Sequence, residues 1–126
     1  MKVLLDTHFI LWAVARPARL KRFPWIDKYM PWGISPVSML EIQFLGELGK
    51  LDLRPGFFEA LESDPRFVVD EPPLVALVGQ AMSLGWTHDP FDRLLAAHSR
   101  LRRVPFASTD ELVSLHHPLL VRELRD

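Results

Sequence analysis

The sequence predicts an α/β fold in which a short central parallel sheet is covered by helices on both faces. Short apolar runs, each of a length suited to a strand, alternate with longer segments that have helical spacing. Proline, serine, aspartate and glycine separate the two kinds of segment and mark helix starts and stops. This alternation is typical of parallel sheets whose strands are connected by helices.

The composition indicates one globular domain. The 126 residues, of which 48% are hydrophobic, suffice for a real core. We find no repeat, low-complexity segment or linker, so we expect a single domain over residues 1–126. The chain has no cysteine, which excludes disulfides and fits an intracellular protein. Asp6 interrupts the first apolar run too early for a signal peptide or a membrane span, so we expect a cytoplasmic protein.

The first third of the chain begins with a predicted buried strand over residues 2–5, which ends at Asp6. Thr7 is predicted to cap the helix that follows. Residues 18–30 mix basic and apolar side chains, which predicts an amphipathic helix broken near Pro24.

The second predicted strand covers residues 32–35, and Pro36 opens the next helix. Ser38 is the predicted cap of that helix, because Glu41 follows it at the spacing of a capping box. The helix is expected to end near Gly49.

The remaining predicted elements continue the same alternation. They are a small helix over 55–62, a strand over 67–69, a helix over 74–84, a helix from Asp89-Pro90 to about Arg102, a strand over 105–108, a short helix from Glu111 and a fifth short strand over 119–121.

Acidic residues follow or adjoin several of these strands. Asp6 comes after the first strand and Asp110 after the fourth, and Glu41, Asp89 and Asp92 lie in the first turns of neighbouring helices. Ligands of open parallel sheets bind beyond the carboxyl ends of the strands, so we expect these groups to share one edge. Crowded carboxylates repel each other unless a cation lies among them, and oxygen ligands suit Mg²⁺ or Mn²⁺.

Each acid also has a purely structural interpretation. Asp6, Asp89 and Asp110 are suitable helix caps, and Asp89 precedes a proline, as a cap often does. Glu41 fits a capping box, and Asp92 lies where a carboxylate favours the helix dipole. The functional hypothesis therefore depends on their common location. For the pair in DPFDR, we predict that Asp89 caps the helix and Asp92 reaches the metal.

Four stretches, in this order, resemble the PIN-domain ribonucleases and, among them, the VapC-type toxins of bacterial toxin–antitoxin pairs. They are LLDTHFILW (4–12), SPVSMLEI (35–42) with ELGKL (47–51), DPFDRLLAAHS (89–99) and ASTDELV (107–113). The resemblance implies a three-layer α/β/α sandwich with a parallel sheet. The sequence departs from the family's pattern at Leu40, Leu45 and His98, where tryptophan, lysine and glutamine are common.

The resemblance implies a metal-dependent endoribonuclease, which hydrolyses RNA phosphodiester bonds with water activated by Mg²⁺ or Mn²⁺. The family's acidic metal ligands fall on Asp6, Glu41, Asp92 and Asp110. Three hydroxyl residues are expected to orient the carboxylates or waters: Thr7, Ser38 and Ser108.

The resemblance also implies partners: a second copy of the chain, in a homodimer or a larger assembly, and a small antitoxin whose segment blocks the acidic site. Two basic clusters either attract RNA or are ordinary solvated helix faces. They are Arg16, Arg19, Lys21 and Arg22, and Arg93, Arg100, Arg102 and Arg103. His8 and His88 either assist RNA binding and proton transfer or orient neighbouring groups.

Three other functions compete with the ribonuclease interpretation of this sequence. An aspartyl phosphatase needs a second acid two residues after Asp6, where this chain has His8. A phospho-receiver domain needs a lysine near the last strand, and none follows Asp110. The remaining alternative is a catalytically inactive PIN fold that binds RNA or protein, and the four retained acids argue against it.

Overall fold

A four-stranded parallel sheet forms the centre of the computed structural model, which describes residues 1–125. The strands are β1 (Val3–Leu5), β2 (Trp32–Ile34), β3 (Phe67–Val69) and β4 (Phe106–Ala107). Their order is β3-β2-β1-β4, and each neighbouring pair is parallel. The predicted fifth strand is reduced to one bridge between Phe106 and Leu120.

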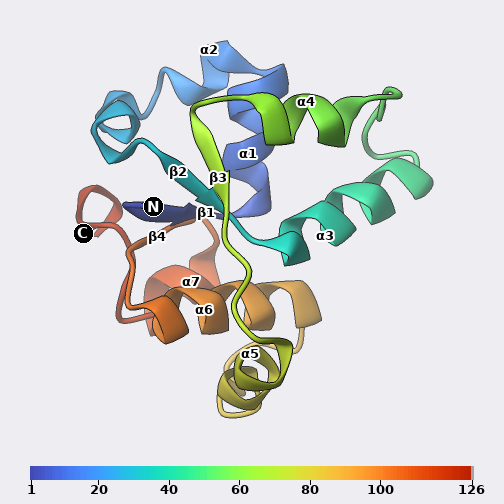
Figure 1. Cartoon of the computed structure of the whole chain (residues 1–126). Coiled ribbons are helices and arrows are strands. Elements are labelled where there is room, and N and C mark those ends of the chain that lie inside the picture. The colour runs from blue at the N-terminus through green and yellow to red at the C-terminus, as the bar shows by residue number, and fades with distance from the viewer. Residues whose placement is uncertain (126) are drawn as a thin grey trace.

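The helices alternate with the strands and cover both faces of the sheet (Figure 1). In chain order they are α1 (Thr7–Ala15), α2 (Pro17–Leu20), the 3-10 helix η1 (Pro24–Tyr29), α3 (Pro36–Glu47), α4 (Phe57–Ser63), α5 (Leu74–Ala81), α6 (Pro90–Arg102), α7 (Glu111–His116) and the 3-10 helix η2 (Arg122–Leu124). Within residues 1–125, no helix is long and apolar enough to cross a membrane.

The break predicted near Pro24 in the helix of residues 18–30 is present. Two separate short helices begin at Pro17 and Pro24, each with its proline in the first turn. Proline lacks a backbone N–H and so cannot donate the bond that would continue a preceding helix. The second of the two is a 3-10 helix rather than an α-helix, which the sequence pattern did not predict.

The side chains of β1 alternate between two apolar layers. Val3 and Leu5 pack with Phe9 and Ile10 of α1 on one face. Leu4 packs on the other face in a cluster with Leu95 of α6 and Val113 of α7. Successive strand residues point to opposite faces, so a continuous apolar run marks a strand that is buried on both sides. The predicted α/β sandwich is therefore confirmed.

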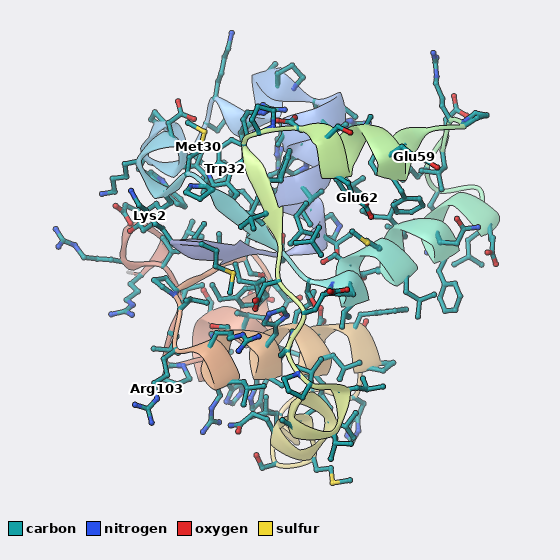
Figure 2. All side chains as sticks on the ribbon, viewed as in Figure 1. Lys2, Met30, Trp32, Glu59, Glu62 and Arg103 are labelled. Carbon is teal, nitrogen blue, oxygen red and sulfur yellow. The ribbon has the colours of Figure 1, made fainter. Side chains whose placement is uncertain are left out.

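Apolar side chains point into the interior around the sheet, and charged side chains point outward (Figure 2). Trp32 of β2 is buried, and its indole nitrogen donates to the carbonyl of Ile26 at 2.9 Å. Lys2, Glu59 and Arg103 are exposed and extend from the periphery. The helix α5 lies outside α6, against which Leu77 and Ala81 of α5 and Leu84 of the following loop pack.

Two helix caps differ from the prediction. Asp6, not Thr7, caps α1 and accepts from the N–H of Phe9 at 3.0 Å. Ser35, not Ser38, caps α3 and accepts from the N–H of Val37 at 3.2 Å. A cap needs extended backbone, which Asp6 and Ser35 have. Thr7 and Ser38 lie inside the helices, so their hydroxyls are available for other contacts.

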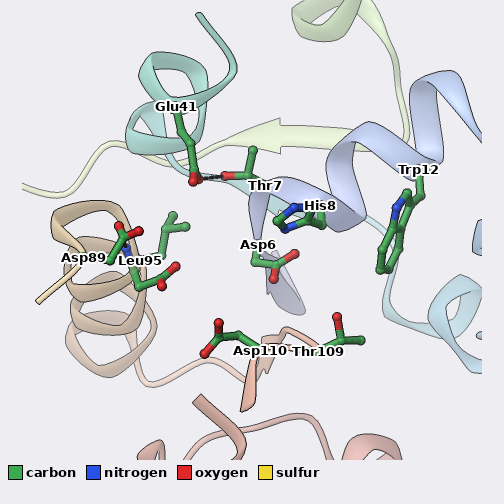
Figure 3. Close-up of a pocket in the computed structure, with 10 residues that line it drawn as sticks. Asp6, Thr7, His8, Trp12, Glu41, Asp89, Leu95, Thr109 and Asp110 are labelled. Atoms are coloured by element: carbon green, nitrogen blue, oxygen red, sulfur yellow. Dashed lines mark hydrogen bonds between the residues drawn. The ribbon is translucent and has the colours of Figure 1, made fainter. Parts of the chain in front are cut away.

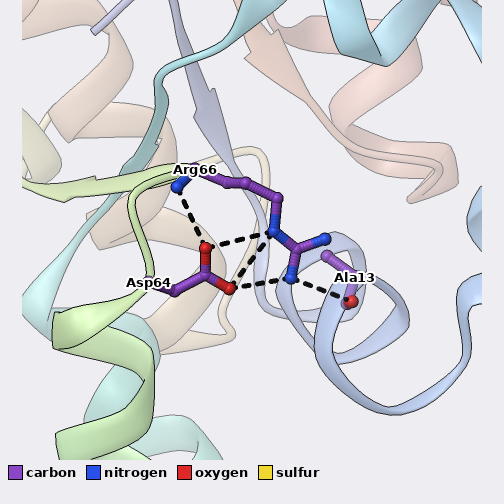
Figure 4. A network of polar contacts seen from close by, with 3 residues as sticks. All are labelled: Ala13, Asp64 and Arg66. Carbon is purple, nitrogen blue, oxygen red and sulfur yellow. Dashed lines mark hydrogen bonds and ion pairs between the residues drawn. The ribbon is translucent and has the colours of Figure 1, made fainter.

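Ion pairs anchor both ends of β3. Near its start, Arg66 donates from Nε and Nη2 to the carboxylate of Asp64 and from Nη2 to the carbonyl of Ala13 at 3.5 Å (Figure 4). Beyond its end, the carboxylate of Asp70 accepts from Arg102 Nε at 2.8 Å and lies 2.7 Å from Nε2 of the buried His98. These contacts connect β3 to α1 on one side and to α6 on the other.

We expect Asp64→Ala to lower the free energy of unfolding by about 0.5–1.5 kcal/mol, because Arg66 loses its bidentate partner in a partly exposed site. Urea denaturation measures this change. Asp52→Ala is the matched control, since the Asp52–Arg54 pair is fully exposed and 3.9 Å apart. The control should stay within about 0.5 kcal/mol of the parent. Equal effects of the two substitutions would contradict the anchoring role.

Candidate active site

A pocket of about 300 Å³ opens beyond the carboxyl ends of β1 and β4 (Figure 3). It brings together all four predicted acidic site residues, together with Asp89. Its lining consists of Asp6, Thr7, His8, Trp12, Glu41, Asp89, Asp92, Leu95, Thr109 and Asp110. Trp12, Leu95 and Thr109 were not predicted to line the site, because apolar and hydroxyl residues of this kind carry no distinct signal beside the acidic residues.

Asp6 is the most buried acid of the pocket, with 7% of its surface exposed. The pKa of Asp6 is raised to about 6, chiefly by burial and to a smaller extent by the nearby charge of Glu41. Hydrogen bonds from the N–H of Phe9 and from Ser108 oppose this shift, as does the charge of His8. Asp6 is therefore held in place as a helix cap, and its neighbours compensate the negative charge of its carboxylate only in part.

Hydroxyl groups connect Glu41 to α1. Thr7 Oγ1 donates to Glu41 Oε1 and lies 3.1 Å from the hydroxyl of the buried Ser38. A threonine hydroxyl has one hydrogen, so donation to Glu41 leaves Ser38 as the donor in the Thr7–Ser38 pair. The hydroxyls of Ser38 and Thr7 therefore fix the direction of the Glu41 carboxylate. Figure 3 shows the contact between Thr7 and Glu41.

Asp89 and Asp92 share the first turn of α6 but have different environments. Asp89 is the cap and accepts from the N–H groups of Phe91 at 2.8 Å and Asp92 at 3.2 Å. Asp92 is half-buried, and this burial raises its pKa to about 7. The charges of Asp89, Asp110, Glu41 and Asp6 contribute to the same shift, in that order.

Asp110 and Ser108 complete the opposite wall. Asp110 caps α7 by accepting from the N–H of Val113 at 3.1 Å. Its own N–H donates to the buried hydroxyl of Ser108 at 3.1 Å. Ser108 also lowers the pKa of Asp6, so this one serine influences acids at the ends of both β1 and β4.

The donor chemistry of the pocket fits a divalent cation. Its acidic groups offer only oxygen ligands, and burial together with the neighbouring carboxylates raises the pKa of Asp6 and Asp92, so a positive ion would stabilise their charged forms. Among residues 1–125, no three acidic or imidazole groups stand close enough to hold one ion in their present rotamers. Ligation would therefore require some side chains to rotate toward a common point.

The fold and pocket define an α/β/α protein with an acidic site at the carboxyl edge of its sheet. The family model of the PIN domain matches residues 3–114, and the chain belongs to this family. A similar solved structure is that of VapBC2 from Rickettsia felis bound to a DNA fragment from their promoter. It has 15% identity and a TM-score of 0.66, and the match covers 96% of each chain. No curated protein matches the sequence.

We expect Asp92→Asn to raise the melting temperature of the metal-free protein at pH 8. The folded-state pKa of about 7 lies above the ordinary 3.8, so the folded state binds more protons between these values. Stability is therefore lost as the pH rises through this window, and an amide avoids the loss. Thermal unfolding in EDTA at pH 8 and pH 5 measures the effect.

The stabilisation by Asp92→Asn should be smaller at pH 5 than at pH 8. The exposed Asp52→Asn serves as the control for removal of a carboxylate elsewhere, and should show no such pH dependence. A melting temperature that falls at pH 8 on Asp92→Asn would contradict the electrostatic description of the pocket.

Proposed function

We propose that this chain is a metal-dependent endoribonuclease and the toxin of a VapBC-type toxin–antitoxin system. The observation that carries the proposal is the meeting of Asp6, Glu41, Asp92 and Asp110 in one pocket of a PIN-domain fold. Four carboxylates gathered in one pocket, two of which (Asp6 and Asp92) have raised pKa values, are expected where they bind a cation. The similarity to a VapBC structure supports the toxin assignment at the level of fold.

In this proposal, Asp6, Glu41, Asp92 and Asp110 hold one or two Mg²⁺ or Mn²⁺ ions. A divalent cation there supplies charge stabilisation and acidifies water for an in-line displacement at phosphorus. Thr7 and Ser38 orient the Glu41 carboxylate, and Ser108 holds the backbone of Asp110 and favours the charged form of Asp6. The expected products carry a 5′-phosphate and a 3′-hydroxyl.

His8 and His88 have different positions. His8 is exposed and lines the pocket beside Asp6, whose pKa its charge lowers. It is the histidine that we propose meets the RNA at the entrance. His88 does not line this pocket, so its assistance in the reaction has no structural support.

The alternative function is an inactive PIN fold that binds RNA or protein without cleavage. The raised pKa values of Asp6 and Asp92 favour the enzyme, because a binding module gains nothing from crowded carboxylates. Calorimetric titration with Mn²⁺ separates the two functions. The nuclease should bind the ion and lose that binding on Asp6→Asn.

We expect the purified protein to cleave single-stranded RNA with Mg²⁺ or Mn²⁺ and to lose this activity in EDTA. Asp92→Asn should lower the rate by about 10²–10³-fold, the range for loss of one group that stabilises charge at a reacting centre. Asp89→Ala should retain most activity but cost about 0.5–2 kcal/mol of stability, because it removes a helix cap. Gel-based cleavage and urea denaturation measure the two effects.

Two controls make this prediction decisive. Asp52→Asn removes an exposed carboxylate far from the pocket lining and should change neither property. Cleavage that survives both chelation and Asp6→Asn would overturn the proposed function. If Asp89→Ala abolished cleavage and Asp92→Asn only weakened the fold, the roles assigned within DPFDR would be reversed.

The proposed partners are an antitoxin and a second copy of the chain. The outer face of α5 supports self-association, because Leu74, Val75 and Met82 are 71%, 86% and 75% exposed and the helix carries no charged side chain. An uncharged apolar face can meet its own copy without repulsion. A cytoplasmic location likewise stays a prediction.

We expect Val75→Glu to convert a dimer into a monomer in sedimentation analysis. The control is Leu115→Glu on α7, which places the same charge on a residue that is 74% exposed. Addition of the antitoxin encoded beside this chain should shift the parent to a larger species. A parent protein that is monomeric and indifferent to that antitoxin would contradict both partners.

A further inference from the structure

A second pocket of about 300 Å³ adjoins the acidic pocket. We call it the α1–α3 pocket. Its lining consists of His8, Leu11, Trp12, Ala15, Arg16, Leu45, Lys50 and Leu51. His8 and Trp12 line both pockets, so the two cavities are neighbours that share these side chains. A polymer that occupies the acidic pocket can therefore continue directly into its neighbour.

The charges around the acidic pocket favour a polyanion that leaves it toward the α1–α3 pocket. Its carboxylates come from the end of β1, from α3, from the start of α6 and from the residue before α7. The α1 wall, made by His8 and Trp12, is free of carboxylates among the described lining residues. In Figure 3 this wall lies across the pocket from Asp89. A nucleic-acid strand meets the least repulsion if it leaves past His8 and Trp12.

The α1–α3 pocket combines the two chemical features that a nucleotide requires. Leu11, Leu45 and Leu51 provide an apolar lining, and Trp12 provides an aromatic ring. Arg16 and Lys50 are exposed cations, and the described lining contains no carboxylate. Proteins that bind single-stranded RNA use this combination of a stacking surface for the base and cations for the phosphate.

Helical spacing aligns three of these side chains in one direction. His8, Trp12 and Arg16 are four residues apart on α1 and its cap, so they form one row along about 12 Å of the helix. The row begins at the acidic pocket and ends at the guanidinium. An imidazole, an indole and a cation therefore follow each other along the path proposed for the strand.

Trp12 is held rigidly for this role. Phe23 stacks on its ring at 5.7 Å with an interplanar angle of 4°, and Phe9 contacts it edge-on at 5.0 Å. The guanidinium of Arg19 lies 4.9 Å from the ring centroid and adds a third cation nearby. Because the indole is already fixed, stacking against it costs little side-chain entropy.

We propose that the α1–α3 pocket binds the nucleotide next to the scissile phosphate of single-stranded RNA. The base contacts Trp12 and the leucine lining, and its phosphate lies between Arg16 and Lys50. The inference rests on the proposed function, because it takes the acidic pocket as the place of cleavage. An apolar segment of a protein partner is the other possible occupant, and the exposed cations without carboxylates favour the polyanion.

The test compares two double variants of equal net charge. Arg16→Gln/Lys50→Gln removes the two cations of the pocket, and Lys2→Gln/Arg54→Gln removes two exposed cations outside its lining. The probe is a short fluorescein-labelled single-stranded RNA, whose anisotropy is followed in EDTA at several NaCl concentrations. Loss of the one phosphate contact that Arg16 and Lys50 share should lower the slope of log affinity against log salt by about 0.7 in the first variant alone.

Stacking has its own readout. RNA should quench the tryptophan fluorescence of the parent, and this quenching should largely disappear in Trp12→Phe, with RNA binding retained. The melting temperature of Trp12→Phe verifies that its core is intact. Quenching that is unchanged in Trp12→Phe would overturn the role of Trp12.

The outcomes separate this inference from the proposed function. If the two double variants bind RNA alike, or if the parent does not bind RNA, the subsite is wrong, while cleavage with Mg²⁺ decides the function independently. If Arg16→Gln/Lys50→Gln loses antitoxin binding but not RNA affinity, the pocket belongs to a protein segment and the proposal is overturned. RNA affinity lost only in that variant, without cleavage by the parent, would support the subsite and reject the nuclease.

Discussion

Repulsion among carboxylates at one edge of the sheet is the constraint on which the rest of this molecule depends. The parallel order of β1 and β4 brings Asp6 and Asp110 to the same side, and α3 and α6 add Glu41 and Asp92. Burial first, and the neighbouring carboxylates second, raise the pKa of Asp6 to about 6 and that of Asp92 to about 7. The surrounding fold must be stable enough to hold these groups together, and the two apolar layers on either side of the sheet supply that stability.

The structural and functional interpretations of the acids are compatible. Asp6, Asp89 and Asp110 all cap helices, yet all three also line the pocket. A cap uses one carboxylate oxygen for a backbone N–H, so the second oxygen remains available to the pocket. Capping also fixes the side chain and so keeps the second oxygen directed at the pocket. The same residue can therefore start a helix and belong to the site.

The order of strands and helices and the four acids were predictable, because strand length, capping residues and proline are local signals. The caps of α1 and α3 were each misplaced, since Thr7 and Ser38 are also plausible caps and only backbone geometry distinguishes them from Asp6 and Ser35. The α1–α3 pocket was not predictable. It depends on Leu45 and Lys50 lying against α1, which is a tertiary contact with no local pattern in the sequence.

The ion pairs at the ends of β3 have a consequence for association of the folded chain. β3 is an edge strand, whose outer N–H and C=O groups have no neighbouring strand in the sheet. Such an edge invites pairing with strands of other molecules. Here it is three residues long, and Asp64 with Arg66 and Asp70 with His98 and Arg102 tie its ends to the helices. A foreign strand would find little backbone to extend, so these pairs protect the protein from edge-to-edge aggregation.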